Sequence, residues 1–534
     1  MGESAHVDRF VLERLPPPGQ QPDFLFDLPE LEYPARLNAA AELLRRATEA
    51  AGAEGRALLD FDHEFSWARV DAISGRMARV LVEDLGLVPG NRLLLHGPNS
   101  SWTVLAWFAI LKAGGVVVAT MPMLRATELA TVIGKAQISH ALVYETLAGT
   151  VEEARAAAPS LARVMTSSEL QRAAQDQPPG VSFTPVDTAA DDPALIAFTS
   201  GTTGKPKGCV HFHRDVLAMA DTFGRHMLDL RPGDVVVGTP PIAFTFGLGG
   251  LVVFPAAAGA ATAFPDRPGF EALAETIERQ RATAIFTAPT GYRALLKLAD
   301  QHDLSSLRTC VSAGETLPAA TSEAWHGATG VRIVDGIGST EMIHIFISAK
   351  GDDIRPGCTG RAVPGYEARI VDEAGEPLPA GSTGRLAVRG PTGCRYLEDE
   401  RQAAYVQNGW NLTGDVYRLD EEGRFWFVAR SDDMIISSGY NIGAPEVENA
   451  LLGHPAVAEA AVIGAPDEER GQIVKAFVVL HPGREPSDAL RCELQAHVKA
   501  VIAPYKYPRA LEFVDSLPKT QTGKLQRFRL KGGA

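Results

Sequence analysis

Short apolar runs alternate with helical stretches between about Arg92 and Val253. NRLLLHG precedes SWTVLAWFAILKAG, and VVVATM precedes a polar helical stretch and HALVYE. This alternation predicts strand–helix–strand units, which build parallel sheets covered by helices. A second round runs from AIFTAPT to VRIVDGIGSTE, and its strands end in loops rich in Gly, Ser and Thr. Open α/β sheets bind their ligands at such loops.

The pattern changes at about Tyr366, where polar and apolar residues alternate around Gly and Pro. This alternation predicts antiparallel hairpins. After Arg430 the chain has strand and helix patterns of its own, among them EVENALLGH, KAFVVL and DALRCELQAHVKAVI. We therefore expect an α/β protein with a large N-terminal domain, residues 1–431, made of several subdomains with parallel-rich sheets and a β-rich subdomain. A small, mobile α+β domain, residues 432–534, should follow it.

Composition narrows the possible functions. A chain of 534 residues is long enough for two or more domains. Its net charge of -14 argues against a nucleic-acid partner. The five scattered cysteines favour a reducing compartment, and the N-terminal MGESAHVDRF does not resemble a secretory signal. The uncharged run Phe246 to Phe264 contains Pro255 and many Gly and Ala, so we expect a short helix, a turn and a buried strand rather than a membrane span. A cytoplasmic protein without a membrane partner is expected.

The strongest chemical signal is the segment TSGTTGKPKG, which follows the apolar run ALIAF. Its glycines let the backbone turn tightly and expose N–H groups, and its hydroxyls and lysines add donors for phosphate oxygens. The spacing of a Walker A loop is absent. A flexible surface loop is the alternative interpretation.

Four further segments carry polar groups suited to a nucleotide. DGIGSTEM offers Thr340 for a phosphate and Glu341 for Mg²⁺, which prefers carboxylate and phosphate oxygens. NLTGD places Asp415 after a tight turn, where its carboxylate suits a ribose diol. RSDDMIISSGYN lies at the expected domain boundary, and PKTQTGK ends in Lys524. Singly, these segments also fit a capped helix, an ordinary turn or a solvated chain end.

Together, and in this order, the segments resemble the adenylate-forming superfamily of acyl-CoA synthetases, luciferases and peptide-synthetase adenylation domains. The resemblance runs from about Arg92 to Arg529. A narrower resemblance, to benzoate-CoA and 2-aminobenzoate-CoA ligases, rests on HFHRDVLA, PPIAFTFGLGG, DGIGSTEMIHIFIS, GPTGCRYL, YVQNGWNLTGD, DDMIISSGYNIGAPEVE and IAPYKYPR. It makes 2-aminobenzoate the first substrate to test.

The superfamily resemblance implies a set of residues that bind ATP. Thr340 would touch the α-phosphate, Glu341 would hold Mg²⁺, and Asp415 would bind the ribose with help from Arg430. The residues expected around the β- and γ-phosphates are Thr199, Ser200, Gly201, Thr202, Thr203 and Lys207, and those expected beside adenine are Gly314, Glu315, Asp335 and Gly336.

The resemblance also assigns residues to the acid and to CoA. Lys524 would be the catalytic lysine, Asp432 the hinge, and Ser438, Gly439 and Tyr440 would lie along the CoA route. Many members have Lys where this chain has Ile436, so no CoA contact is transferred to that position. The acid pocket would comprise Phe244, Thr245, Phe246, Gly247, Ala313, Ile337 and His344. Phenylalanines beside small residues suit a flat aromatic ring, although Phe244, Phe246 and His344 also fit an ordinary core.

Elementary chemistry supports Lys524 independently. A carboxylate that attacks the α-phosphate brings two anions together, and a positioned cation with Mg²⁺ relieves their repulsion. His211 and His213 are close in sequence, but a metal site would need a third ligand nearby.

The expected reaction is ATP + aromatic acid + CoA → aroyl-CoA + AMP + pyrophosphate, through a bound aroyl-adenylate. ATP, Mg²⁺ and CoA are the expected cofactors and co-substrates, and a small aromatic carboxylate is the expected partner. One alternative is an enzyme that loads the acid onto a carrier-protein thiol. The other is a nucleotide-binding sensor without catalysis. The sequence does not determine the oligomeric state.

Overall fold

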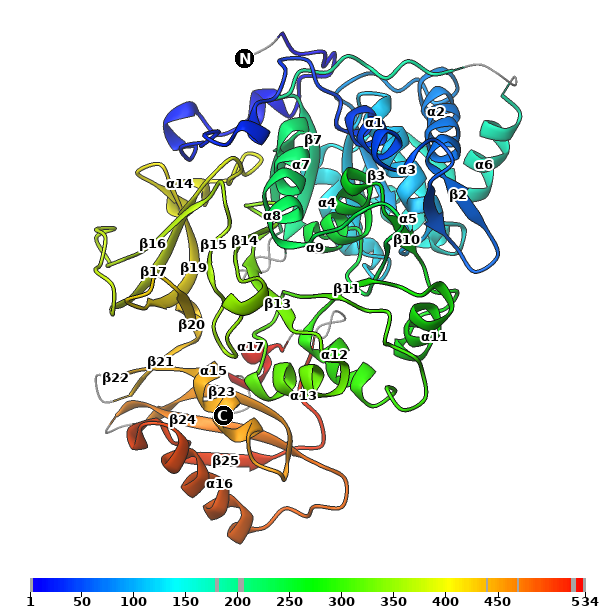
Figure 1. The fold of residues 1–534 in the computed structure, drawn as a ribbon. Coiled ribbons are helices and arrows are strands. Elements are labelled where there is room, and N and C mark those ends of the chain that lie inside the picture. The colour runs from blue at the N-terminus through cyan, green and yellow to red at the C-terminus, as the bar shows by residue number, and fades with distance from the viewer. Residues whose placement is uncertain are drawn as a thin grey trace.

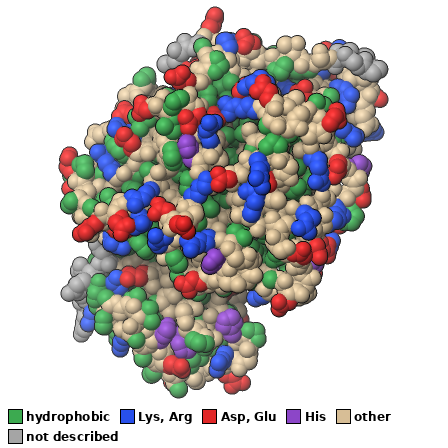
Figure 2. Space-filling view, in the orientation of Figure 1, with side chains coloured by type: hydrophobic (Ala, Val, Ile, Leu, Met, Phe, Trp, Pro, Cys, Tyr) green, Lys and Arg blue, Asp and Glu red, His purple; other side chains and the backbone are tan. Residues whose placement is uncertain are grey.

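The computed structural model describes residues 3–177, 182–199, 206–437, 440–467, 470–519 and 525–531. Figure 1 shows two helix-covered sheets and a third, antiparallel sheet in the upper body, and a smaller lobe below them at the C-terminal end of the chain. On the face shown in Figure 2, acidic and basic side chains are interspersed over both parts. The architecture confirms the predicted α/β class with parallel-rich sheets and a small C-terminal domain.

The first helix-covered sheet is built from the strand–helix alternation around Arg92. Its elements are β3 (Arg92–His96), α3 (Ser101–Lys112), β4 (Val116–Thr120), α4 (Ala126–Ala136), β5 (His140–Val143), α5 (Ala148–Ala156), β6 (Arg163–Thr166), α6 (Ser167–Gln175), β7 (Pro193–Thr199) and β8 (Lys207–Phe212). The strand order in the described part of the chain is β6–β5–β3–β4–β7–β8. All neighbours pair in parallel except β8, which runs antiparallel to β7. Strands β3 and β5 are buried along their whole length, which explains their continuous apolar sequence.

The second sheet forms the centre of the molecule. Its strands are β1 (Arg56–Leu59), β2 (Glu64–Ser66), β9 (Val235–Gly238), β10 (Ala261–Ala263), β11 (Ala284–Thr287), β12 (Thr309–Ser312), β13 (Ile333–Gly338), β14 (Ile345–Ser348) and β15 (Arg361–Ala362). The order is β15–β14–β13–β12–β11–β9–β10–β1–β2. Pairing is parallel from β1 to β13, with antiparallel strands added at both ends. The remaining helices between residues 39 and 329 include α1 (Ala39–Ala51), α2 (Trp67–Glu83), α7 (His213–Met219), α8 (Arg225–Met227), α11 (Phe270–Gln280), α12 (Pro289–Leu296) and α13 (Ala319–Thr329).

The uncharged run near Phe246 folds as predicted, into short helices, a turn and a buried strand. Helix α9 (Thr245–Leu248) continues through a π-helical turn, Gly249–Val253, into α10 (Phe254–Ala258). Gly259 then adopts a left-handed conformation with φ of 67° and leads into β10. A second π-helical turn, Ala220–Gly224, follows α7. Across the described residues, every helix is too short or too polar to cross a membrane.

The predicted hairpins after Tyr366 form an antiparallel sheet. Its elements are β16 (Glu367–Val371), β17 (Thr383–Arg389), α14 (Gln402–Tyr405), β18 (Val406–Gln407), β19 (Trp410–Leu419) and β20 (Phe425–Arg430). Strand β19 pairs with β17, β18 and β20. This sheet carries Asp415 and Arg430 on adjacent strands.

The last part of the chain forms the lower lobe of Figure 1. Its elements are β21 (Met434–Ser437), β22 (Tyr440–Gly443), α15 (Ala444–Leu452), β23 (Val457–Asp467), β24 (Gly471–Leu480), α16 (Asp488–Val501), β25 (Ala510–Phe513) and α17 (Arg527–Lys531). Strands β23, β24 and β25 form one sheet, whose apolar residues pack with α15 and α16 into a core of their own. The boundary at Asp432 and the mobility of this domain remain predictions.

Candidate active site

The end of the first sheet and a loop of the second sheet bring Lys207 and Glu341 together. Lys207 begins β8, and Glu341 lies in the loop after β13. Their side chains approach to 3.9 Å between Lys207 Nζ and Glu341 Oε1. The hydroxyl of Tyr396 lies between them: it accepts a hydrogen bond from Lys207 Nζ at 2.9 Å and donates one to Glu341 Oε1 at 2.5 Å. Two residues that are far apart in sequence thus share one buried polar site.

A buried histidine holds the backbone next to Glu341. His211 Nε2 lies 2.7 Å from the carbonyl oxygen of Thr340. Asp215 is close to the other side of the imidazole and accepts a hydrogen bond from Arg395 Nη1 at 2.8 Å. The side chains of His211, Asp215 and Arg395 are all fully buried. His211 therefore has a structural partner in the loop that carries Thr340. His213 has a different one: its Nδ1 accepts a hydrogen bond from the Ala39 N–H, at the start of α1, at 3.1 Å.

The predicted ribose-binding pair is formed across two neighbouring strands. Asp415 and Arg430 are opposite one another in β19 and β20. Arg430 Nη1 donates hydrogen bonds to Asp415 Oδ1 at 2.9 Å and to the Thr413 carbonyl at 3.1 Å. Burial raises the pKa of Asp415, Arg430 opposes that rise, and the charge of Glu341 adds to it. Glu341 is thus close enough to Asp415 for its charge to act on that carboxyl group. We call Lys207, Glu341, Tyr396, Asp415 and Arg430 the nucleotide cluster.

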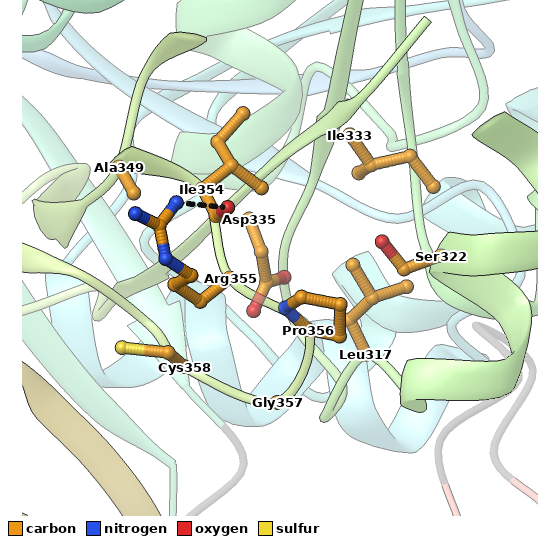
Figure 3. Close-up of a pocket in the computed structure, with 10 residues that line it drawn as sticks. All are labelled: Leu317, Ser322, Ile333, Asp335, Ala349, Ile354, Arg355, Pro356, Gly357 and Cys358. Atoms are coloured by element: carbon orange, nitrogen blue, oxygen red, sulfur yellow. Dashed lines mark hydrogen bonds between the residues drawn. The ribbon is translucent and has the colours of Figure 1, made fainter. Parts of the chain in front are cut away.

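Asp335 lies beside a narrow pocket near the ends of β12 and β13. The pocket is lined by Leu317, Ser322, Ile333, Asp335, Ala349, Ile354, Arg355, Pro356, Gly357 and Cys358, and Figure 3 shows the carboxylate of Asp335 next to Pro356. The Asp335 Oδ1 atom is buried and has no hydrogen-bond partner among the described residues. Burial raises the pKa of Asp335 to about 7. This carboxyl group can therefore accept or donate a hydrogen bond near neutral pH.

His344 is surrounded by phenylalanine rings. Its imidazole centroid lies 4.6 Å from Phe254, 5.1 Å from Phe223 and 5.8 Å from Phe246. Phe286 packs against Phe246 and Phe254. Neither nitrogen of His344 makes a hydrogen bond of normal geometry with a described residue, and burial lowers its pKa to about 3. The imidazole is therefore neutral at pH 7. We call Phe223, Phe246, Phe254, Phe286 and His344 the aromatic cluster.

The other predicted acid-pocket and adenine residues lie around these two clusters. Ala313 is buried after β12, Gly314 has a left-handed φ of 87°, and Ile337 and Gly336 lie in β13. Phe244 caps α9, Thr245 begins it, and Gly247 within α9 leaves no room for a side chain, because a Cβ would lie 2.1 Å from the Pro241 carbonyl oxygen. Glu315 follows Gly314, and its Oε2 accepts a hydrogen bond from the Thr290 hydroxyl at 3.1 Å; its place beside adenine remains a prediction.

Several predicted residues fall outside the described part of the chain. They are Ser200, Gly201, Thr202 and Thr203 of the phosphate loop, Ser438 and Gly439 of the CoA route, and Lys524. The flanking residues are described: Thr199 ends β7 opposite Lys207, and Tyr440 begins β22. Asp432 lies in the short helical turn Ser431–Asp433.

The sequence did not assign several residues that the structure brings into these clusters. Tyr396 belongs to the motif GPTGCRYL, which carried the narrow resemblance without a role for its tyrosine. Phe223, Phe254 and Phe286 lie in three apolar stretches that look like ordinary core. Only the packing of the π-helical turns against β11 and β14 brings these rings together around His344. The available signal in the sequence was Tyr396 itself, an aromatic residue within the motif GPTGCRYL.

Comparison with known proteins supports the resemblance to adenylate-forming enzymes that the sequence motifs indicated. The AMP-binding enzyme family matches residues 44–395, and the AMP-binding enzyme C-terminal domain matches residues 446–524. The benzoate–CoA ligase of Thauera aromatica is 36% identical over 512 residues, covering 94% of this chain and 97% of that protein. The mitochondrial acyl-coenzyme A synthetase ACSM3 of Mus musculus is 36% identical over 494 residues, covering 88% and 84%. The crystal structure of the anthranilate CoA ligase AuaEII in complex with anthranoyl-AMP is 37% identical, with a TM-score of 0.89 and coverage of 95% and 99%.

Proposed function

Because this chain belongs to the AMP-binding enzyme family, we propose that it is an AMP-forming acid–CoA ligase that acts on small aromatic carboxylates. ATP and the acid form an aroyl-adenylate and pyrophosphate, and the thiol of CoA then displaces AMP to give the aroyl thioester. We propose 2-aminobenzoate, which is the anthranilate of the relative described above, as the preferred acid and benzoate as the second.

The aromatic cluster carries the proposal of an aromatic substrate. A flat ring packs well edge-on or offset against phenylalanine rings, and Phe246 belongs to the segment that the resemblance assigns to the acid. Gly249 has no side chain, and a Cβ there would lie 2.5 Å from His344 Cδ2. The imidazole of His344 therefore occupies the space that a side chain at position 249 would need. A long alkyl chain would have to displace these rings.

His344 supports the choice of 2-aminobenzoate over benzoate. Its neutral imidazole has an acceptor nitrogen without a hydrogen-bond partner. The amino group of 2-aminobenzoate is a donor that fits such an acceptor, and benzoate has none. A buried acceptor that stays unpaired costs about 1–3 kcal/mol.

The nucleotide cluster supplies the groups that an adenylating enzyme needs. Lys207 offers a cation for phosphate oxygens, and the Asp415 carboxylate accepts hydrogen bonds from the ribose hydroxyls. Glu341 fits Mg²⁺, because this ion is usually bound by one or two carboxylates together with substrate phosphates. When bound, Mg²⁺ would offset the negative charge that gathers on the phosphates. Asp335, with its unpaired Oδ1, suits the amino group of adenine.

The two half-reactions require different parts of the C-terminal domain. We propose that Lys524 serves adenylation and that Gly439 lines the route of the CoA thiol. A small domain cannot present both segments to one site at once, so it would rotate about Asp432 between the steps, as gating domains do. Lys524→Ala should lower the rate of adenylation by roughly 10²–10³ and still convert supplied aroyl-adenylate and CoA. Gly439→Leu should form adenylate but release little thioester. Equal loss of both steps in both variants would contradict the rotation.

A pyrophosphate-release assay tests the function directly. The acids are 2-aminobenzoate, benzoate and palmitate, each with ATP and Mg²⁺, and thioester formation is then compared with free CoA and with a carrier protein as acceptor. We expect turnover of the two aromatic acids with free CoA and very little with palmitate. Efficient use of palmitate without aromatic turnover would overturn the proposed substrate class. Turnover with a carrier protein alone would indicate a carrier-loading enzyme, and no pyrophosphate with any acid would indicate a nucleotide sensor.

A further inference from the structure

Tyr396 lies on a segment that extends the first sheet beyond its edge strand. Leu397 N–H donates to the Gly208 carbonyl at 2.8 Å, and Val210 N–H donates to the Arg395 carbonyl at 2.8 Å. These bonds join the segment after β17 to β8, the strand that Lys207 begins. The backbone of Tyr396 is therefore fixed to the same strand as the predicted phosphate-binding lysine.

The ring of Tyr396 is held as firmly as its backbone. Tyr396 N–H donates to Gln402 Oε1 at 2.9 Å, and the Tyr405 ring packs edge-on at a centroid distance of 5.7 Å. The Tyr396 side chain is 1% exposed. A ring with this little freedom fixes the position of its hydroxyl oxygen.

That hydroxyl is the shared hydrogen-bond partner of Lys207 and Glu341. It accepts from the ammonium at 2.9 Å and donates to the carboxylate at 2.5 Å, while the two charged groups stay 3.9 Å apart. Burial and the neighbouring Glu341 raise the pKa of Tyr396 well above its usual range. The phenol therefore keeps its proton and remains a donor to the carboxylate.

We propose that Tyr396 is a positioning residue of the adenylation site, whose hydroxyl keeps Lys207 and Glu341 separate and available for the ATP phosphates and Mg²⁺. The proposal rests on the proposed function, because it takes these two residues as the phosphate and magnesium ligands.

The physical reason is competition between a direct ion pair and the ligand. In a buried site, an ammonium and a carboxylate attract each other strongly. Without the hydroxyl, Lys207 and Glu341 would close into direct contact, and the Mg²⁺–ATP complex would have to break that pair before binding. The phenol satisfies one hydrogen bond of each group, so the pair stays at 3.9 Å, the outer limit of an ion pair, instead of closing into hydrogen-bond contact.

The test compares Tyr396→Phe with Tyr405→Phe. Tyr405 packs against the Tyr396 ring and is partly buried, but its hydroxyl lies 3.4 Å from Ser339 Oγ instead of bridging the charged pair. Binding of an α,β-methylene analogue of ATP is measured by calorimetry over a range of Mg²⁺ concentrations. We expect Tyr396→Phe to weaken binding roughly tenfold, as for loss of a hydrogen bond to a charged group, and to raise the Mg²⁺ requirement. Tyr405→Phe should change neither quantity.

Kinetics and crystallography complete the test. In Tyr396→Phe the KM for ATP should rise by a larger factor than kcat falls, because the hydroxyl acts by positioning Lys207 and Glu341. A ligand-free crystal structure of the variant should show Lys207 Nζ in direct contact with Glu341. Unchanged nucleotide affinity, equal weakening in both variants, or a pair that remains separated would each overturn the proposal.

A second measurement does not depend on removing the hydroxyl. With 3-fluorotyrosine at position 396, the ¹⁹F resonance should shift when the Mg²⁺–ATP analogue binds, and the same label at position 405 should shift much less. An unmoved label at 396 would contradict the proposal. Neither binding experiment contains acid or CoA, so a wrong substrate class would appear only in the turnover assay.

Discussion

The nucleotide cluster and the aromatic cluster, the two parts of the proposed site, differ in whether their polar groups already have partners. The charged side chains of the nucleotide cluster already have partners: Lys207 and Glu341 share Tyr396, and Asp415 has Arg430. In the aromatic cluster, the one polar side chain interacts at most weakly with the Phe246 backbone, and neither of its nitrogens makes a hydrogen bond of normal geometry with a described residue. The first cluster therefore holds its geometry before a ligand arrives, and the second offers a polar group that a ligand must satisfy.

In the proposed function, the nucleotide cluster serves catalysis and the aromatic cluster serves selectivity between acids. Charges placed in advance stabilise the transition state because they need not reorganise during the reaction. An unpaired buried acceptor discriminates between acids because a substrate without a donor leaves it unsatisfied. We therefore expect changes in the nucleotide cluster to affect all acids equally, and loss of the one polar group of the aromatic cluster, His344, to affect the ratio between acids.

The largest effect is expected for Glu341→Gln. Loss of this carboxylate should lower the rate of adenylate formation by roughly 10²–10³ for every acid, the usual cost of removing one group that stabilises transition-state charge. Single-turnover pyrophosphate release checks it, with Glu367→Gln, an exposed partner of Arg389, as the control. A loss confined to one acid would contradict the separation of the two clusters.

A smaller effect is expected for Asp415→Ala. The ribose would lose hydrogen bonds to a charged group, so the KM for ATP should rise roughly 10- to 100-fold. The KM for the acid should change little, because Asp415 lies on β19, away from the aromatic cluster. Steady-state kinetics with circular dichroism as a folding check decides the matter: a folded variant with an unchanged KM for ATP would refute the ribose contact.

His344→Phe should change selectivity more than activity. The preference for 2-aminobenzoate over benzoate should shrink roughly tenfold, the value of about one hydrogen bond to a buried group. The measured quantity is the ratio of kcat/KM for the two acids. Phe286→Leu is the matched control, because Phe286 belongs to the same aromatic cluster but has no polar group, so its loss should lower both values in proportion. An unchanged ratio in His344→Phe would remove His344 from the recognition of the amino group.

A separate effect is expected on stability against acid, where activity is not measured. Burial lowers the pKa of His344 to about 3 in the folded protein, so between pH 6.5 and 3 the unfolded chain takes up a proton that the folded protein does not. Stability is therefore lost as pH falls, with a slope of up to about 1.4 kcal/mol per pH unit from this group. His344→Phe should flatten the dependence of the unfolding free energy on pH between 6 and 4, measured by urea titration.

His302 provides a control of opposite sign for that experiment. Hydrogen bonds to Glu271 and Glu278 raise its pKa. Its contribution to stability is present below its unfolded pKa and is lost as pH rises through its folded pKa. His302→Gln should therefore leave the slope between pH 6 and 4 almost unchanged. Equal flattening by both variants would mean that His344 is not the group responsible.

The sequence by itself determined the class of the fold and its order along the chain. Continuous apolar runs such as LLLH in β3 and VVVAT in β4 predict buried parallel strands, because both faces of such strands are covered. Alternation around Gly and Pro after Tyr366 predicted the hairpins of β16 and β17. This prediction is also local, because tight turns require particular residues such as Gly and Pro. The family resemblance named Lys207, Glu341 and Asp415, and the structure brings Lys207 and Glu341 to one place.

Only the tertiary structure decided which further side chains complete the site. Tyr396 reaches Lys207 because its segment pairs with β8, and that pairing joins residues 189 positions apart. The rings around His344 come from one π-helical turn, from α9 and α10 on either side of the other, and from β11, whose sequences are those of an ordinary core. Local patterns report burial and backbone conformation, whereas contacts between distant segments depend on how whole elements pack. For this reason the aromatic cluster and the hydroxyl between two charges became visible only in three dimensions.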